Sequence, residues 1–233
     1  MTDRRTIDPR EVPNYTVVEA AAYLRLPPTT IRRWIAGQAY GTKSGGPRRA
    51  APVIETAAGR PPLLSFWNLV ELFVLASIRR HHNIPLQKVR KALRYVRREF
   101  GTPRPLAHED FLTDGVELFI EKCGKLIAAS GEGQMAVRRL LEATLRRIER
   151  DPQGLAQRLF PWSRQPDEPT EVEIDPRRAF GRLIIAGTGV PTEVIAERLR
   201  AGDSVSHLAE DYRLEVRQVE AALRWELGRA LAA

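Results

Sequence analysis

Two adjacent prolines between two short amphipathic segments constrain this 233-residue chain more than any other feature. Thr16 and Glu19 stand three residues apart before an apolar segment, as in a capping box, and predict the start of a helix. Pro27 and Pro28 end that helix, because a proline fits only the first turn of a new one. Residues 29–36 then carry apolar side chains at helical spacing. The sequence therefore predicts two short helices joined by a tight turn.

The outer face of the second helix is polar and basic. Opposite its apolar side chains, this helix carries Thr29, Thr30, Arg32 and Arg33. Two short helices with such an outer face are typical of a helix-turn-helix that places its second helix in the major groove of DNA. An amphipathic helix whose arginines are merely solvated is the alternative interpretation.

Charge is distributed unevenly along the chain, whose formal net charge is +8. Residues 1–100 contain 18 Lys and Arg against 7 Asp and Glu, whereas residues 166–233 contain 9 against 13. The positive charge therefore surrounds the expected helix-turn-helix, where it would attract a phosphate backbone. The C-terminal part is acidic.

A wing is expected directly after the two helices. Residues 37–52 are rich in glycine and basic residues and predict a loop. Residues 53–64 alternate weakly around Gly59 and Pro62 and predict a β-hairpin. The basic residues then expected near phosphates are Lys43, Arg48, Arg49 and Arg60. In the alternative, the basic loop makes no fixed contact.

Two longer helices should follow, over residues 66–82 with Ser65 as the cap and over residues 85–100. The side of the second helix opposite its apolar face carries Lys88, Arg90, Lys91, Arg94, Arg97 and Arg98.

This order of elements resembles the winged-helix DNA-binding domain of MerR-type regulators. The resemblance is carried by Thr16, Glu19, Ala20 to Ala22, residues 30–34, and residues 63–65 leading into Leu72. Two features depart from the MerR pattern: Pro27 stands where a capping Ser or Thr is usual, and residues 37–52 are longer than a MerR-type connection.

The middle of the chain predicts a hairpin around Cys123, within residues 116–129, and a helix over residues 134–150. MerR-type proteins dimerise through a helix after the DNA-binding domain, so the resemblance implies that this helix joins a homodimer. A helix packed within its own chain is the equal alternative. Residues 161–171 contain three prolines without an apolar pattern and predict a linker.

The tail, residues 172–233, predicts two short strands and three helices. It resembles the small antitoxin domain often encoded next to a PIN-like ribonuclease toxin. The resemblance rests on Ile174-Asp175-Pro176, Gly181-Arg182, Gly187-Thr188, Val190-Pro191, residues 199–204, residues 208–212 and residues 219–223. Gly189 departs from this pattern, which usually has arginine after the threonine. With its MerR-like front, the chain is similar to the long VapB-type antitoxins.

The resemblance implies an antitoxin that neutralises a PIN-like ribonuclease and binds operator DNA as a homodimer, repressing its own operon. An arginine could enter the carboxylate cluster of the toxin and displace its metal. The candidate toxin contacts are Arg177, Arg178, Arg182, Arg224 and Arg229, with Trp225 in an exposed apolar stripe as a possible anchor. Ordinary surface charge is the alternative role of each arginine.

No pattern predicts an enzyme, a cofactor or a metal site. The four histidines and Cys123 lack metal-ligand spacing, and no catalytic constellation is present. The competing hypothesis is a ligand-sensing transcription regulator without a toxin, whose pocket would use Phe111, Leu118, Phe119 and Leu126.

The expected fold is mainly α, with a mobile arm at residues 1–14 and a winged helix-turn-helix N-terminal domain at residues 15–100. A small α+β middle region at residues 101–160 and a linker at residues 161–171 precede a trihelical C-terminal domain with a short β-hairpin. With no apolar run long enough for a membrane span and no signal peptide, the expected location is the cytoplasm.

Overall fold

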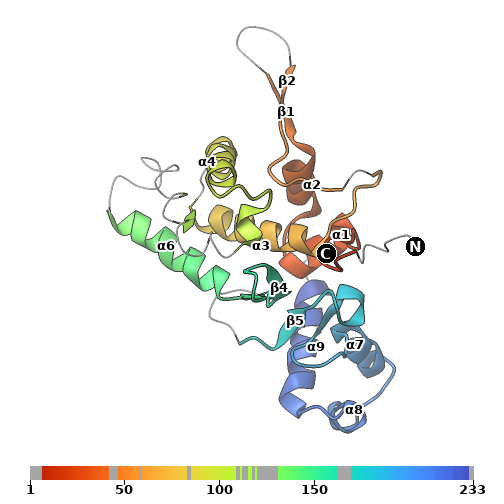
Figure 1. Ribbon diagram of the computed structural model, residues 1–233. Coiled ribbons are helices and arrows are strands. Elements are labelled where there is room, and N and C mark those ends of the chain that lie inside the picture. The colour runs from red at the N-terminus through yellow and green to blue at the C-terminus, as the bar shows by residue number, and fades with distance from the viewer. Residues whose placement is uncertain are drawn as a thin grey trace, which may run out of the picture.

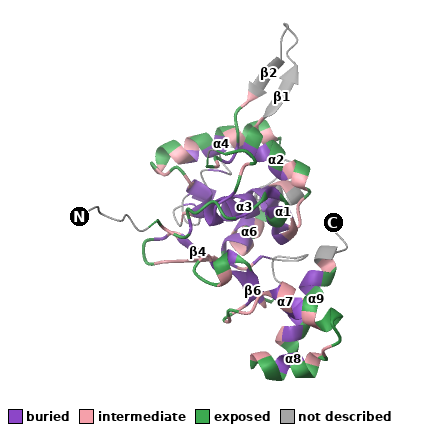
Figure 2. Ribbon diagram, turned by 90° about the vertical axis from the view of Figure 1, so that its right-hand side faces the viewer, coloured by how far each residue is buried: buried purple, intermediate pink, exposed green. Residues whose placement is uncertain are grey.

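The computed structural model describes residues 7–41, 47–57, 59–82, 85–108, 111, 115–116, 119, 131–161 and 169–230. The described chain is mainly helical and includes a small four-stranded antiparallel sheet. In Figure 1, helix α3 (Phe66–His82) crosses the centre of the N-terminal part, and the other helices of that part surround it. Figure 2 shows that buried residues are concentrated in α3. This helix therefore forms the centre of the core.

The two helices predicted around the prolines are confirmed as α1 (Val17–Leu24) and α2 (Pro28–Ala36). The Thr16 hydroxyl accepts a 3.1 Å hydrogen bond from the Glu19 amide, and the Glu19 carboxylate accepts a 2.8 Å bond from the Thr16 amide. Arg25 ends α1 in the left-handed conformation, with φ of 50°. The predicted capping box and proline turn thus form as the sequence indicates.

The predicted position of the hairpin is wrong. The hairpin consists of β1 (Gln38–Gly41) and β2 (Pro47–Ala50), within the segment expected to be a loop. Among the described residues of 53–64, the one ladder contact is the bridge from Leu64 to Tyr15. The Val53 and Ile54 amides donate instead to the Trp34 carbonyl, at 2.8 and 3.3 Å. This segment cannot form a hairpin because its backbone groups bind α2.

The two predicted long helices are confirmed as α3 and α4 (Leu86–Glu99). Ser65 caps α3 together with Asn68, whose backbone N–H donates to the Ser65 hydroxyl at 3.3 Å. Helix α6 (Gly131–Leu145) packs against α3 and buries Leu141 and Leu145. At least part of its apolar face is therefore used within the chain.

Two expectations for the middle of the chain are wrong. The helix predicted over residues 134–150 ends at Leu145, and the last of these residues form β3 (Ile148–Arg150), which pairs with β4 (Ala156–Leu159). The hairpin predicted around Cys123 lies largely outside the described residues, but the described Val116 and Phe119 are buried and helical. Both side chains face the core, which favours helical over alternating geometry.

The predicted strand pair of the tail is confirmed as β5 (Val172–Ile174) and β6 (Leu183–Ile185). Strand β4 pairs with β5, so the sheet order is β3-β4-β5-β6. The strands also add Val172, Ile174 and Leu183 to the main core.

Three helices complete the tail, at the lower right of Figure 1: α7 (Thr192–Arg200), α8 (Val205–Tyr212) and α9 (Val216–Ala230). They enclose a small core of their own. Ser204 caps α8, since its hydroxyl accepts a hydrogen bond from the His207 backbone amide at 3.1 Å.

Candidate nucleic-acid interface and partner surface

Helix α2 presents its polar face from a buried support. Ile31, Trp34 and Ile35 lie in the core, and the Trp34 carbonyl holds the segment that follows the hairpin. On the opposite side, Thr29, Arg32 and Arg33 are exposed and Thr30 is half-buried. The predicted contact residues of α2 therefore lie together on one accessible surface.

The basic residues predicted for the wing do not all lie in the hairpin, because the hairpin is at residues 38–50. Arg48 and Arg49 lie in β2, paired with Tyr40 and Ala39 of β1. Lys43 lies outside the described residues. Figure 1 shows β1 and β2 projecting from the body beyond α2, as a wing would. Arg60 is exposed but belongs to the segment that binds the core rather than to the hairpin.

A basic surface missing from the predicted DNA contacts lies on α4. Val89, Ala92, Leu93 and Val96 face the core, and the basic residues lie on the other sides of the helix. Lys88, Lys91, Arg94 and Arg98 are exposed, and Arg90 and Arg97 are half-buried. The sequence pattern that could have indicated this surface is the series of basic residues between apolar residues spaced three and four apart. We name this set the α4 basic face.

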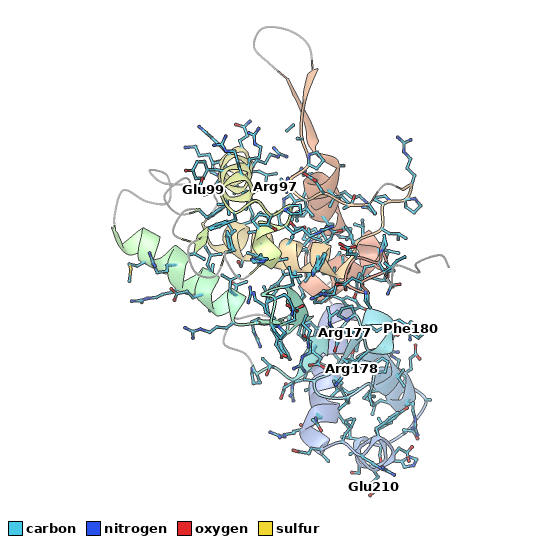
Figure 3. All side chains as sticks on the ribbon, in the orientation of Figure 1. Arg97, Glu99, Arg177, Arg178, Phe180 and Glu210 are labelled. Atoms are coloured by element: carbon cyan, nitrogen blue, oxygen red, sulfur yellow. The ribbon has the colours of Figure 1, made fainter. Side chains whose placement is uncertain are left out.

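A cleft of about 390 Å³ joins α4 to the base of the hairpin. Its walls are residues 50–53 on one side and Gln87, Arg90, Leu93, Arg94 and Arg97 on the other. Arg97 also forms a 2.5 Å ion pair with Glu55. Figure 3 shows side chains of α4, including the labelled Arg97 and Glu99, on the side of the body from which the hairpin projects. Because arginines line this cleft, it suits phosphate groups.

Most arginines predicted to contact a toxin are already paired within the tail. Arg178 lies 3.7 Å from both Glu173 and Asp175, and Arg182 lies 3.0 Å from Glu193. The remaining candidates divide as follows: Arg224 pairs with Glu171 and Glu220, Arg177 is exposed, and the side chain of Arg229 lies outside the described part of the chain.

The expectation that Trp225 is exposed is wrong. Trp225 is 6% exposed, because α9 packs its side chain against the N-terminal part. The Arg25 guanidinium lies over the indole, 4.7 Å from its centroid. Trp225 is therefore part of the core and is not available as an anchor. Helical spacing could not identify this contact, which joins residues 200 positions apart.

The competing hypothesis of a ligand sensor expected a pocket, but two of the residues named for it are core residues. Phe111 and Phe119 are fully buried and pack edge to face, with centroids 6.0 Å apart. Leu118, Leu126 and Cys123 lie outside the described residues. Within the described ranges, no three His, Cys, Asp or Glu side chains are grouped as a metal site. No described helix is long and apolar enough to cross a membrane.

Comparison with known families divides the chain into two matching regions. Residues 13–93, which contain the two helices, the hairpin and most of α4, match a family described as "Putative DNA-binding HTH domain". Residues 172–225 match a family described as "Protein of unknown function (DUF433)". These matches associate the surface on α2 with a class of helix-turn-helix DNA-binding proteins.

Comparison with individual proteins covers almost the whole chain. A protein named "Putative antitoxin VapB45" from Mycobacterium tuberculosis is 29% identical in an alignment of 229 positions that covers 91% of this chain and 93% of that protein. "Uncharacterized protein Rv2308" of the same organism is 28% identical in an alignment of 243 positions that covers 96% of this chain and 95% of that one. The crystal structure of Rv2018 from M. tuberculosis superimposes with a TM-score of 0.65 at 28% identity, covering 91% and 98% of the two chains.

The chain is thus homologous to a protein named as a VapB antitoxin and to a helix-turn-helix DNA-binding domain. Together these relationships support an antitoxin that binds DNA.

Proposed function

We propose that the chain is the antitoxin of a type II toxin–antitoxin system. It neutralises a PIN-like ribonuclease toxin and binds operator DNA as a homodimer to repress its own operon. A MerR-like arrangement of α2, the β1–β2 wing and α4 forms the DNA-binding surface. The observation that carries the DNA-binding half is the exposed face of α2, mounted on buried Ile31, Trp34 and Ile35. A projecting hairpin follows α2 (Figure 1), and the basic helix α4 lies at the base of that hairpin.

Each part of this surface has a separate task. The side chains of Thr29, Arg32 and Arg33 enter the major groove, where Arg can donate two hydrogen bonds to a guanine edge. The hairpin, with Arg48 and Arg49 in β2, follows the adjacent backbone. The α4 basic face binds phosphates and fixes the orientation of the protein without reading sequence.

The test of the DNA-binding half is a titration of the full chain against a duplex from the region upstream of its own gene. A shuffled duplex of the same length measures non-specific affinity. We expect Arg33→Ala or Arg32→Ala to weaken binding to the upstream duplex by about 1–3 kcal/mol, because each loses a base or phosphate contact. Arg146→Ala, at an exposed arginine after α6, is the matched control.

Two outcomes would contradict the proposed repressor. Equal affinity of the unaltered protein for the two duplexes would mean that the upstream region contains no operator for this protein. Full affinity in both arginine variants would remove α2 as the recognition helix.

The antitoxin half is supported by the near full-length similarity to the protein named VapB45. In this half, the tail binds the toxin and covers its carboxylate cluster. The candidate arginines Arg177, Arg178, Arg182 and Arg224 of the tail are exposed and supply charge complementary to those carboxylates. The expected consequence is a stable complex with the protein encoded beside this chain's gene, in which ribonuclease activity is lost.

A further inference from the structure

The turn η4 (Ala179–Gly181) between β5 and β6 displays the most exposed large apolar side chain among the described residues. Phe180 is 87% exposed, whereas the other aromatic residues whose side-chain burial the structure describes are buried or half-buried. We propose that Phe180, together with Arg177, anchors the toxin on the tail. The inference rests on the proposed function and names the surface and the chemistry of the partner face.

The backbone holds Phe180 outward at the cost of strain. Ala179 and Phe180 have φ of 44° and 55°, in the left-handed region that bulky residues avoid, and Gly181 follows with φ of 75°. A residue persists in this region only when its surroundings fix it, and such residues concentrate at ligand-binding sites. An exposed phenylalanine without a binding partner would gain no contact that offsets this strain.

The contacts that fix the turn come from the N-terminal part and from the turn itself. The Asn14 amide side chain donates a 2.5 Å hydrogen bond to the Phe180 carbonyl. The Gly181 amide donates to the Arg178 carbonyl at 2.8 Å. A Cβ at Gly181 would collide with the Tyr15 hydroxyl, so the turn approaches Tyr15, just before α1, as closely as a glycine allows. The side chain of Phe180 is therefore presented by a rigid frame.

Positive charge surrounds this aromatic side chain. Three of the nine basic residues of the acidic region 166–233 fall within the six positions from Arg177 to Arg182. Carboxylates of the tail already pair with Arg178 and Arg182. Arg177 is exposed and its charge helps to lower the pKa of the Asp8 carboxyl, but it forms no ion pair with a carboxylate in the described ranges. It is therefore available to a partner.

An apolar anchor beside an available guanidinium fits a protein face that has an apolar pocket bordered by carboxylates. Aromatic residues and Arg are the types enriched at protein–protein interfaces. A toxin whose active site is a carboxylate cluster, as proposed above, would supply the carboxylates of such a face. A second copy of the chain would bring the same arginines together and be repelled. Figure 3 shows Phe180, Arg177 and Arg178 on the side of the body away from the hairpin. DNA bound at the hairpin and α4 would therefore leave the η4 turn accessible.

The experiment measures the affinity of the full chain for the purified protein encoded beside its gene, by calorimetry. We expect Phe180→Ala to weaken binding about 30-fold, as truncation of a hot-spot residue does. Arg177→Gln should weaken it about tenfold. Leu227→Ala, at a 66% exposed leucine of α9, and Arg200→Gln, at an exposed arginine of α7, are the controls and should change it less than twofold.

The outcomes are separable. If the unaltered chain does not bind the neighbouring protein, the proposed antitoxin function fails and this inference fails with it. If the chain binds and Phe180→Ala binds equally well, the inference alone is overturned. If Phe180→Ala instead changes the sedimentation of the chain by itself, the turn serves a second copy and the inference is again overturned. Unchanged affinity of both variants for the upstream duplex shows that the loss is not due to misfolding.

Discussion

The Arg25 guanidinium lies 4.7 Å from the centroid of the Trp225 indole and donates a 3.2 Å hydrogen bond to the Trp225 carbonyl. Arg25 ends the first helix of the helix-turn-helix, and Trp225 lies on the last helix of the chain. A cation held over an indole is attracted by the negative face of the ring. The final helix is therefore attached to the end of α1.

This attachment has neighbours that reinforce it. Asn14 binds the η4 turn, and Tyr15 packs against Gly181. Strand β4 pairs with β5 through Leu159 and Ile174. The η4 turn is thus held by the two residues that stand directly before the N-cap of α1.

Trp225→Ala is expected to lower the free energy of unfolding by about 3 kcal/mol, because it leaves a cavity in the core and removes the surface on which Arg25 lies. Trp225→Phe, which retains an aromatic face, should recover more than half of the loss. Urea denaturation followed by circular dichroism measures both. Leu227→Ala, on an exposed position of the same helix, is the control. A loss below about 1 kcal/mol in Trp225→Ala would contradict the packing role.

The α4 basic face should contribute affinity without sequence preference. Replacing Lys88, Lys91 and Arg94 together with glutamine removes three exposed charges. The slope of log affinity against log salt should then decrease by about 3, roughly 1 for each lost phosphate contact. The upstream and shuffled duplexes should lose affinity equally. Glutamine at Arg139, Arg146 and Arg200, which are exposed elsewhere, is the charge-matched control. An equal change of slope in the control would indicate net charge rather than this face.

Local signals in the sequence predicted most of the helices. Thr16 with Glu19, Pro28 at the first turn of α2, Ser65 and Ser204 each act on backbone groups within a few residues. Such contacts form wherever the residues occur, so the starts of α1, α2, α3 and α8 could be read directly.

Features that depend on distant contacts could not be predicted in the same way. The hairpin shifted to residues 38–50 because Val53 and Ile54 bind the end of α2. Trp225 was expected to be exposed because nothing near it in sequence indicates Arg25. The candidate interface was predicted on α2, but α4 was omitted because its spatial relation to the hairpin appears only in the folded chain.

The strain at Phe180 predicts a conflict between stability and binding. Glycine adopts the left-handed conformation without the cost of about 1–2 kcal/mol that other residues incur. Part of this gain is lost to the greater freedom of glycine in the unfolded chain. We therefore expect Phe180→Gly to raise the free energy of unfolding by up to about 1 kcal/mol, while it weakens toxin binding as Phe180→Ala does. Urea denaturation of the two variants side by side measures the first effect. A Phe180→Gly variant less stable than Phe180→Ala would show that the turn is unstrained.

Glu71 should make the protein less stable as pH rises. Burial in α3 raises the pKa of its carboxyl to about 7, against the opposing effects of Arg104, Asn68 and Arg97, and Glu55 adds a smaller increase. The Arg104 guanidinium is 3.3 Å from this carboxylate. In the unfolded chain the carboxyl ionises near 4.5, so between the two pKa values the unfolded state binds fewer protons than the folded state.

The free energy of unfolding contributed by Glu71 is therefore fully present below pH 4.5 and is lost as pH rises to about 7, a change on the order of 3 kcal/mol. Glu71→Gln stays neutral and can still accept a hydrogen bond from Asn68 or Arg104. Its stability relative to the unaltered protein should increase across this interval and stay constant above it. Urea denaturation between pH 4.5 and 8 measures the difference, with Glu99→Gln, exposed on α4, as the control. A difference independent of pH would mean that Glu71 ionises alike in the folded and unfolded chain, and the assigned effect of burial would be wrong.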